Sequence, residues 1–163
     1  DAAGQLLQVQ RAYGTPLQQN YATYTYTANG QRQTVTDANG NLSTLEYDGL
    51  DRLAKLRFPV TTKGAGLSST SDFELYGYDA AGNRISLRKR DGRVLTYSFD
   101  ALNRERVKTV PASVSGAPGY SVYRGYDGNR RIAGAGATPT RATEPSPTSG
   151  YGEPAPCSRP ICR

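Results

Sequence analysis

The fold is decided by a heptapeptide, Tyr78-Asp79-Ala80-Ala81-Gly82-Asn83-Arg84, which has a second form in Phe99-Asp100-Ala101-Leu102-Asn103-Arg104. In both forms an aromatic residue and an aspartate precede a short turn-forming segment and an arginine. A third copy follows the same order in Tyr47-Asp48-Gly49-Leu50-Asp51-Arg52. A motif that recurs at regular spacing is typical of a repeat protein, in which each unit is one supersecondary element.

The repeat has a period of 52 residues. A shift of that length aligns positions 24–66 with 76–118 without a gap and produces 13 identities. Each unit has two arms that begin 21 residues apart, and the four arms start at Tyr26, Tyr47, Tyr78 and Phe99. Partial units are expected at both ends, because Tyr126-Asp127 starts another motif and Asp1 fits the second arm of an earlier unit, with Leu6 and Val9 in the places of Leu53 and Leu56.

The residues between the motifs predict strands and turns. Asn39-Gly40 and Asp91-Gly92 are strong signals for two-residue type I′ turns, which need a positive φ at both central positions. Apolar residues alternate with Thr and Ser through 95–99, which indicates one apolar and one polar face. No segment has a sustained helical period. The sequence therefore predicts about eight to ten antiparallel strands in one curved sheet with essentially no helix.

If the 52-residue register is correct, equivalent aromatics occupy equivalent places. Tyr26 and Tyr78 are expected to lie on the same face of the sheet, and so are Tyr47 and Phe99. A slip of one residue would reverse every side chain.

The three motif copies resemble the signature of the YD-repeat, or Rhs, family, and the resemblance covers roughly residues 1–130. It implies an all-β fold of stacked antiparallel β-hairpins that form one curved sheet, a section of a hollow shell. Members of this family are large secreted or cell-surface proteins. In bacterial toxins the shell encloses a C-terminal toxic domain, and in animal relatives it is part of a cell-adhesion receptor.

We divide the chain into two parts. Residues 1–132 are assigned to the hairpin array, with units near 24–75 and 76–123, and residues 133–163 to a tail rich in Pro, Gly, Ser and Thr. Six of the ten prolines lie in this tail, which is expected to be disordered. An alternative is that residues 129–163 are out of frame, because the motif that begins at Tyr126-Asp127 breaks off at Asn129.

The repeated residues are interpreted as scaffolding. Tyr is expected to pack between hairpins, Asp to accept hydrogen bonds from turn amides, and the motif arginines, together with Arg32, to pair with Asp; a ligand-binding ladder is the alternative. The structural motif residues are Tyr26, Tyr47, Asp48, Arg52, Tyr78, Asp79, Gly82, Arg84, Phe99, Asp100, Arg104, Tyr126 and Asp127.

The densest basic cluster flanks the Asp91-Gly92 turn and consists of Arg88, Lys89, Arg90 and Arg93. These residues are expected at a hairpin tip. One interpretation is a ligand-binding site for phosphate, nucleic acid or sulfated sugar; the other is a solvated turn whose charges discourage edge-to-edge sheet pairing.

Catalysis and cofactor binding have little support. The chain has no His, so a His-based catalytic centre is not available. Its two cysteines, Cys157 and Cys162, lack two further zinc ligands. Family members that cut themselves use an Asp-Pro motif, and this chain has no Asp-Pro. We expect no enzyme activity and no cofactor.

The partners follow from charge and from the resemblance. The net charge of +6 is spread too thinly to predict specific nucleic-acid binding. No apolar run approaches the ~18 residues that span a membrane. We expect a structural segment, secreted or at the bacterial cell surface, whose partner is a toxin or effector domain of the same polypeptide. The alternative is an adhesion module that binds cell-surface carbohydrate.

Taken alone, the chain is expected to be marginally folded or to aggregate through unpaired sheet edges.

Overall fold

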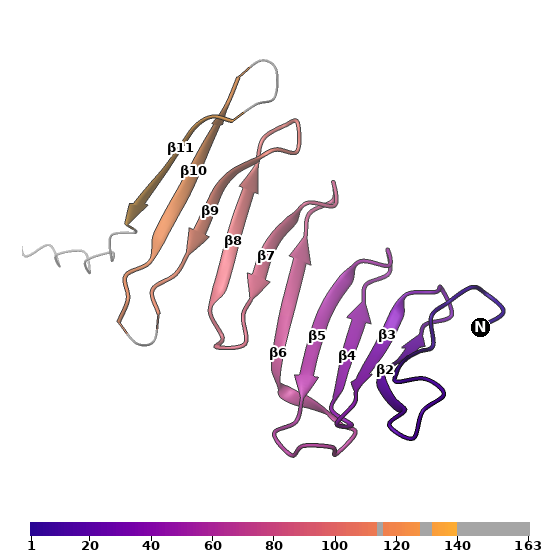
Figure 1. Cartoon of the computed structure of the whole chain (residues 1–163). Coiled ribbons are helices and arrows are strands. Elements are labelled where there is room, and N and C mark those ends of the chain that lie inside the picture. The colour runs from indigo at the N-terminus through magenta and orange to yellow at the C-terminus, as the bar shows by residue number, and fades with distance from the viewer. Residues whose placement is uncertain (114–115, 128–131, 140–163) are drawn as a thin grey trace, which may run out of the picture.

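The computed structural model describes residues 1–113, 116–127 and 132–139, and these residues form a single β-sheet. The sheet has eleven antiparallel strands in chain order, so every strand pairs with its sequence neighbours (Figure 1). The strands are β1 (Gln8–Arg11), β2 (Gln19–Tyr26), β3 (Arg32–Asp37), β4 (Leu42–Tyr47), β5 (Leu53–Pro59), β6 (Ser68–Tyr78), β7 (Arg84–Arg88), β8 (Val94–Phe99), β9 (Glu105–Val110), β10 (Tyr120–Tyr126) and β11 (Ile132–Pro139). No helix occurs among the described residues.

The all-β sheet is as predicted, but it has one strand more than the upper estimate. The additional strand is β11, which pairs with β10 from Tyr120↔Pro139 to Tyr126↔Ile132. The sheet thus continues past residue 132, where the sequence placed the end of the array. The sequence pattern did not predict this strand, because small residues such as Gly134 and Gly136 leave it without apolar alternation. The rest of the proposed tail, residues 140–163, lies outside the described residues.

The two predicted hairpins are present, but their turns are wider than predicted. Gly40 has a φ of 78°, whereas Asn39 is not among the described residues with a positive φ, so this is not a type I′ turn. The Gly40 amide donates to the Asp37 carbonyl (3.0 Å), and the Asp37 amide donates to the Asn41 carbonyl (3.1 Å). This is a type I turn followed by one left-handed residue, the next most common hairpin loop. The Lys89–Arg93 turn is built in the same way around Gly92, with a φ of 85°.

Strand register separates the two faces of the sheet. Residues that are directly opposite on neighbouring strands share a face, as do alternate residues along one strand. One face, here the aromatic face, includes Tyr24, Tyr26, Leu45, Tyr47, Leu56, Tyr76, Tyr78, Leu87, Leu95, Tyr97, Phe99 and Tyr126. The other, here the hydroxyl face, includes Thr25, Thr34, Thr44, Ser86, Thr96, Thr109 and Ser121.

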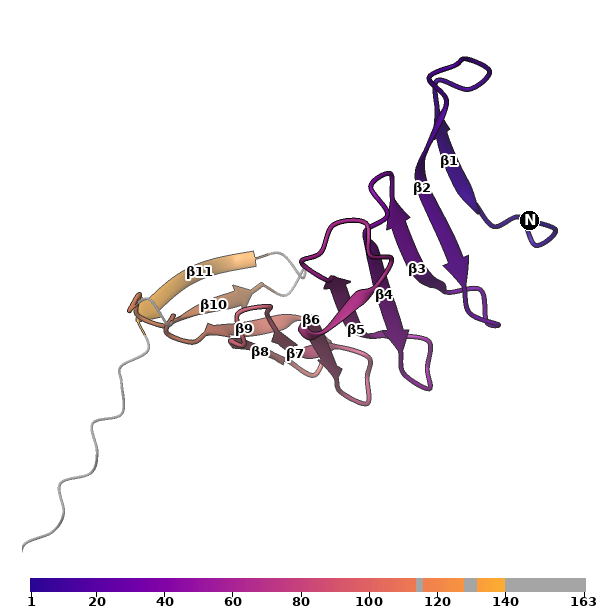
Figure 2. The same ribbon diagram turned by 90° about the horizontal axis from the view of Figure 1, so that it is seen from below.

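The described part of the chain forms one layer, which twists along its length (Figure 2). Because no second layer covers either face there, burial is sparse: the buried residues of the described part are Ala22, Leu87, Val110, Gly119 and Ser121. No described side chain has a relative exposure below 2%. Stability must therefore depend on contacts between neighbouring strands and turns.

Candidate functional site: the Tyr-Asp edge

One turn geometry recurs along one edge of the sheet, here called the Tyr-Asp edge. In the turn from Asp79 to Asn83, the Asp79 amide donates to the Asn83 carbonyl (3.0 Å), and the Gly82 amide donates to the Asp79 carbonyl (3.1 Å). Gly82 is left-handed, with a φ of 85°. The same pair of hydrogen bonds closes the turns that begin at Asp1, Thr27, Asp48 and Asp100.

The aspartate that opens a turn accepts hydrogen bonds from that turn, as predicted. Asp48 accepts from the amides of Leu50 (2.9 Å) and Arg52 (3.0 Å) and from Nε of Arg52 (2.8 Å). Asp100 makes the same three contacts with Leu102 and Arg104. Each carboxylate thus satisfies backbone donors that the tight turn leaves without a strand partner. The contact is structural and leaves these carboxylates poorly placed for chemistry.

These hydrogen bonds lower the pKa of each carboxyl group. For Asp79, the side-chain amide of Asn83 holds the pKa below its usual value, and backbone amides act in the same direction. For Asp48 and Asp100, burial by itself raises the pKa, but the hydrogen bonds from backbone amides and from the turn arginine outweigh it, so the pKa is lowered. All three groups are therefore held in the charged form.

We predict that acid weakens the sheet through these groups. An unfolded Asp has a pKa of about 3.9, and the folded values are lower, so the folded state binds fewer protons. The stabilisation is present above about pH 4 and is lost as the pH falls further, through the folded pKa values. Urea titrations between about pH 2 and pH 6 should show this decline, and a variant with Asn at positions 48, 79 and 100 should show a flatter one. An unchanged midpoint down to the lowest pH would contradict the prediction.

The left-handed turn position supplies a second prediction. An added Cβ at Gly82 would meet nothing within 4 Å, so alanine there is opposed only by the backbone conformation. We expect Gly82→Ala to cost about 1–2 kcal/mol of unfolding free energy. Gly49 is the matched control, because it lies in an equivalent turn with open space and no positive φ. Equal effects of Gly82→Ala and Gly49→Ala in urea titrations would show that the left-handed position carries no strain.

The tyrosine of each motif joins its hairpin to the preceding one. The hydroxyl of Tyr78 donates to the carbonyl of Leu53 (2.9 Å), and the hydroxyl of Tyr26 donates to the carbonyl of Leu6 (2.7 Å). Leu53 and Leu6 each follow the turn aspartate by five residues. Both tyrosines end their strands on the aromatic face, so their predicted equivalence is confirmed.

The same geometry recurs at Tyr47, which begins a second arm, and at Tyr126, which begins the next partial unit. The hydroxyl of Tyr47 donates to the carbonyl of Arg32, and that of Tyr126 to the carbonyl of Glu105, both at 2.7 Å. Phe99 also ends its strand on the aromatic face, as predicted, but has no hydroxyl to donate. The ladder shifts register by one residue before each of these five aromatics: Tyr26, Tyr47, Tyr78, Phe99 and Tyr126.

The prediction for the motif arginines is half right. Arg52 pairs with Asp48 and Arg104 with Asp100. Arg52 also lies over the ring of Tyr78 (4.6 Å) and donates to the carbonyl of Asp79 (3.2 Å), so it connects consecutive turns. The prediction was wrong for two other arginines, which lie over tyrosine rings instead: Arg32 over Tyr24, and Arg84 over Tyr76 and Tyr97. Each follows the residue that opens its turn by five positions, one more than Arg52 and Arg104, and its side chain lies on the aromatic face; the turn before Arg32 opens with Thr27 and has no aspartate to pair with.

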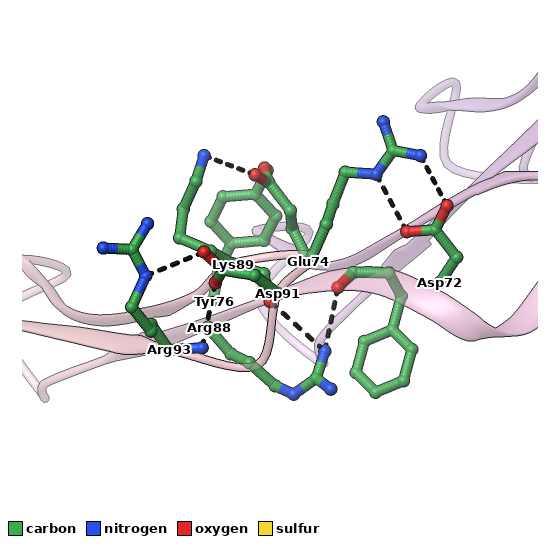
Figure 3. A network of polar contacts seen from close by, with 9 residues as sticks. Asp72, Glu74, Tyr76, Arg88, Lys89, Asp91 and Arg93 are labelled. Carbon is green, nitrogen blue, oxygen red and sulfur yellow. Dashed lines mark hydrogen bonds and ion pairs between the residues drawn. The ribbon is translucent and has the colours of Figure 1, made fainter. Parts of the chain in front are cut away.

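The basic cluster lies at the opposite edge, at the predicted hairpin tip between β7 and β8. Lys89 pairs with Glu74 (2.6 Å) and Arg90 with Asp72 (2.8 Å), both on β6 (Figure 3). The other two cluster members are also engaged: Arg93 pairs with Asp91, and Arg88 donates to the carbonyl of Phe73. All four cations therefore have internal partners, and the cluster presents no prearranged anion site.

Sequence reasoning missed the residues that engage this tip. The acids Asp72 and Glu74 come from β6, the longest strand, which extends beside the turn. Phe73 lies under both Lys55 and Arg88 (4.2 Å each), and Phe58 lies under Arg90 (4.0 Å). Tyr76 is bound to Glu74 (2.8 Å), and burial first, then that carboxylate, raises the pKa of Tyr76 to about 12. The available signal was that the acids Asp72 and Glu74 alternate with the apolar residues Phe73 and Leu75.

The hollow beside the Tyr-Asp edge holds no catalytic arrangement. A hollow of ≈ 330 Å³ lies between two turns of the Tyr-Asp edge and is lined in part by Asn29, Tyr47, Asp48 and Asp51. Its polar groups are engaged, since Asn29 donates to Asp51 (3.0 Å) and Asp48 belongs to its own turn. The described residues contain no cluster of His, Cys, Asp or Glu able to hold a metal ion. They also include no helix long and apolar enough to cross a membrane.

This geometry defines a class of protein, a β-sheet array built from repeated Tyr-Asp hairpins. A family model described as Teneurin YD-shell matches residues 1–115. The chain belongs to this Teneurin YD-shell family and is a structural section of such a shell.

Solved structures share the fold. The chain is similar to the crystal structures of TcdB2-TccC3-Cdc42 (20% identity) and TcdB2-TccC3-TEV (19% identity), each with a TM-score of 0.68. It is also similar to the Tc holotoxin pore of Photorhabdus luminescens, with a TM-score of 0.67 and 20% identity. In each case the match covers 85% of this chain but 8% of the other. No curated protein matches the chain.

Proposed function

We propose that this sheet is one section of a wall that encloses a toxin or effector domain of the same, longer polypeptide, and that the polypeptide is secreted or displayed at a bacterial cell surface. The observation that carries the proposal is the repeated contact along the Tyr-Asp edge. At four of the five described boundaries a hairpin joins the preceding one through a tyrosine hydroxyl and a main-chain carbonyl, so further hairpins of this kind can be added in the same way. Such an array makes a surface rather than a pocket.

The proposal is supported by the similarity to solved toxin structures, one of which is a Tc holotoxin pore. This chain spans 8% of the chain matched there, so the activity of a whole protein is part of the proposal. No contact in the sheet specifically favours the alternative, carbohydrate binding at the basic tip, because the cations there have internal partners.

Limited proteolysis of the full-length polypeptide tests the enclosure. We expect the enclosed domain to resist protease while the wall is folded, and to be cut rapidly when the same domain is expressed alone. A domain that is cut equally fast in both settings would overturn the proposal. A protease-resistant fragment that contains the present chain is the internal check that the wall itself is folded.

A further inference from the structure

The sheet has five boundaries at which consecutive hairpins meet along the Tyr-Asp edge: β1/β2, β3/β4, β5/β6, β7/β8 and β9/β10. At every boundary the strand ladder stops short of that edge. At β3/β4 the last ladder pair is Thr34↔Thr44, three residues before Tyr47, and at β7/β8 it is Ser86↔Thr96, three residues before Phe99. The ends of the strands are therefore joined by side chains rather than by the ladder.

Four boundaries have a tyrosine hydroxyl in this place, and β7/β8 does not. Phe99 follows the same register shift as Tyr47 and pairs with Glu105 as Tyr47 pairs with Leu53. The carbonyl that corresponds to the acceptors of the tyrosines belongs to Arg84. Phenylalanine fills the position but cannot donate to this carbonyl.

The boundary β7/β8 also lacks the turn arginine that connects consecutive turns at β5/β6 and β9/β10. At β5/β6, Arg52 reaches from one turn to Tyr78 and Asp79 of the next, and at β9/β10 the corresponding Arg104 lies over Tyr126 (4.6 Å). The residue at this place before β8 is Asn83, whose amide donates to the exposed side chain of Asn103 (2.9 Å). Arg84 over Tyr97 (5.3 Å) adds one further contact. Among the described boundaries, β7/β8 is thus the one with neither a tyrosine hydroxyl nor a turn arginine.

We propose that the sheet opens first at β7/β8, starting from the Tyr-Asp edge, while the Lys89–Arg93 turn keeps the far ends of β7 and β8 together. The ion pairs of that turn with β6 hold the closed end. The opening divides the array into β1–β7 and β8–β11. If the chain is part of a wall, as proposed above, this opening gives the wall a defined place at which it separates, and that consequence rests on the proposed function. The opening itself is a property of this chain alone.

Amide hydrogen exchange of the 163-residue chain tests the opening, with a matched pair of variants. Tyr47 and Phe99 are equivalent, so Phe99→Tyr supplies the hydroxyl at β7/β8 and Tyr47→Phe removes it at β3/β4. In the unaltered chain, we expect amides of the Ser86↔Thr96 pair to exchange about fivefold faster than those of Thr34↔Thr44, the factor expected for one missing hydrogen bond. Phe99→Tyr should remove this difference, and Tyr47→Phe should accelerate exchange at β3/β4 by a similar factor.

Three results would overturn the proposal: equal exchange at the two boundaries in the unaltered chain, no slowing by Phe99→Tyr, or uniform exchange of all strand amides through global unfolding. None of these depends on whether the wall encloses a domain. Failure of the exchange experiment and failure of the proteolysis experiment are therefore separate outcomes.

Discussion

Replacement of Tyr78 by alanine is expected to lower the unfolding free energy by about 3 kcal/mol, near the lower end for loss of a large aromatic. Three interactions disappear together: the packing of the half-buried ring, the hydrogen bond to the Leu53 carbonyl and the contact with the Arg52 guanidinium. Tyr78→Phe keeps the ring and should cost only about 1 kcal/mol, the usual net value of one hydrogen bond.

Urea titrations followed by circular dichroism measure these differences. Sulfate should be present, because it strengthens apolar burial and keeps a weakly stable chain folded. Tyr13→Ala is the matched control, since Tyr13 is 79% exposed in a loop at the other edge and should change the unfolding free energy by less than about 0.5 kcal/mol. If Tyr78→Ala behaves like Tyr13→Ala, the Tyr-Asp edge does not hold the hairpins together.

Leu87→Ala is the second change with a large expected effect, about 2–3 kcal/mol. Leu87 is 8% exposed and lies on the aromatic face between its register partners Tyr76 and Leu95. The expected loss is at the lower end for a buried leucine, because a single open layer can relax around the cavity more easily than a closed core.

Leu50→Ala is the control for this change. Leu50 is 72% exposed in the turn that begins at Asp48, where its backbone amide, not its side chain, makes the contact. Its replacement should leave the urea midpoint nearly unchanged. Equal losses for Leu87→Ala and Leu50→Ala would show that the aromatic face contributes no packing energy.

The sequence predicts local features of this fold well. The motif places a turn after each aspartate, and the structure has hairpin turns there because aspartate accepts from the following amides in a contact that spans four residues. The 52-residue register likewise predicts which aromatics share a face. Both features depend on residues that are close in sequence or separated by a constant interval.

Features that depend on pairing across strands were harder to predict from the sequence. The acceptor of the Tyr78 hydroxyl, Leu53, is 25 residues away and is a carbonyl that any residue could supply, so no side-chain pattern marks it. The turn type was wrong at Asn39-Gly40 because Asp37 accepts from the Asn39 and Asn41 amides and so favours a wider loop. The partners of the basic tip on β6 could be seen only once the register of β6 with β7 was known.

We infer that this chain is a wall section whose stability depends on neighbouring hairpins. In the described sheet, β1 pairs only with β2 and β11 only with β10, so each has an unpaired edge, and few side chains are buried. Urea unfolding and sedimentation velocity of the isolated chain test the claim most directly. We predict a shallow transition of low stability, with self-association that increases with concentration. A monomer that unfolds in one sharp transition with more than about 5 kcal/mol, the range of self-sufficient domains, would contradict it.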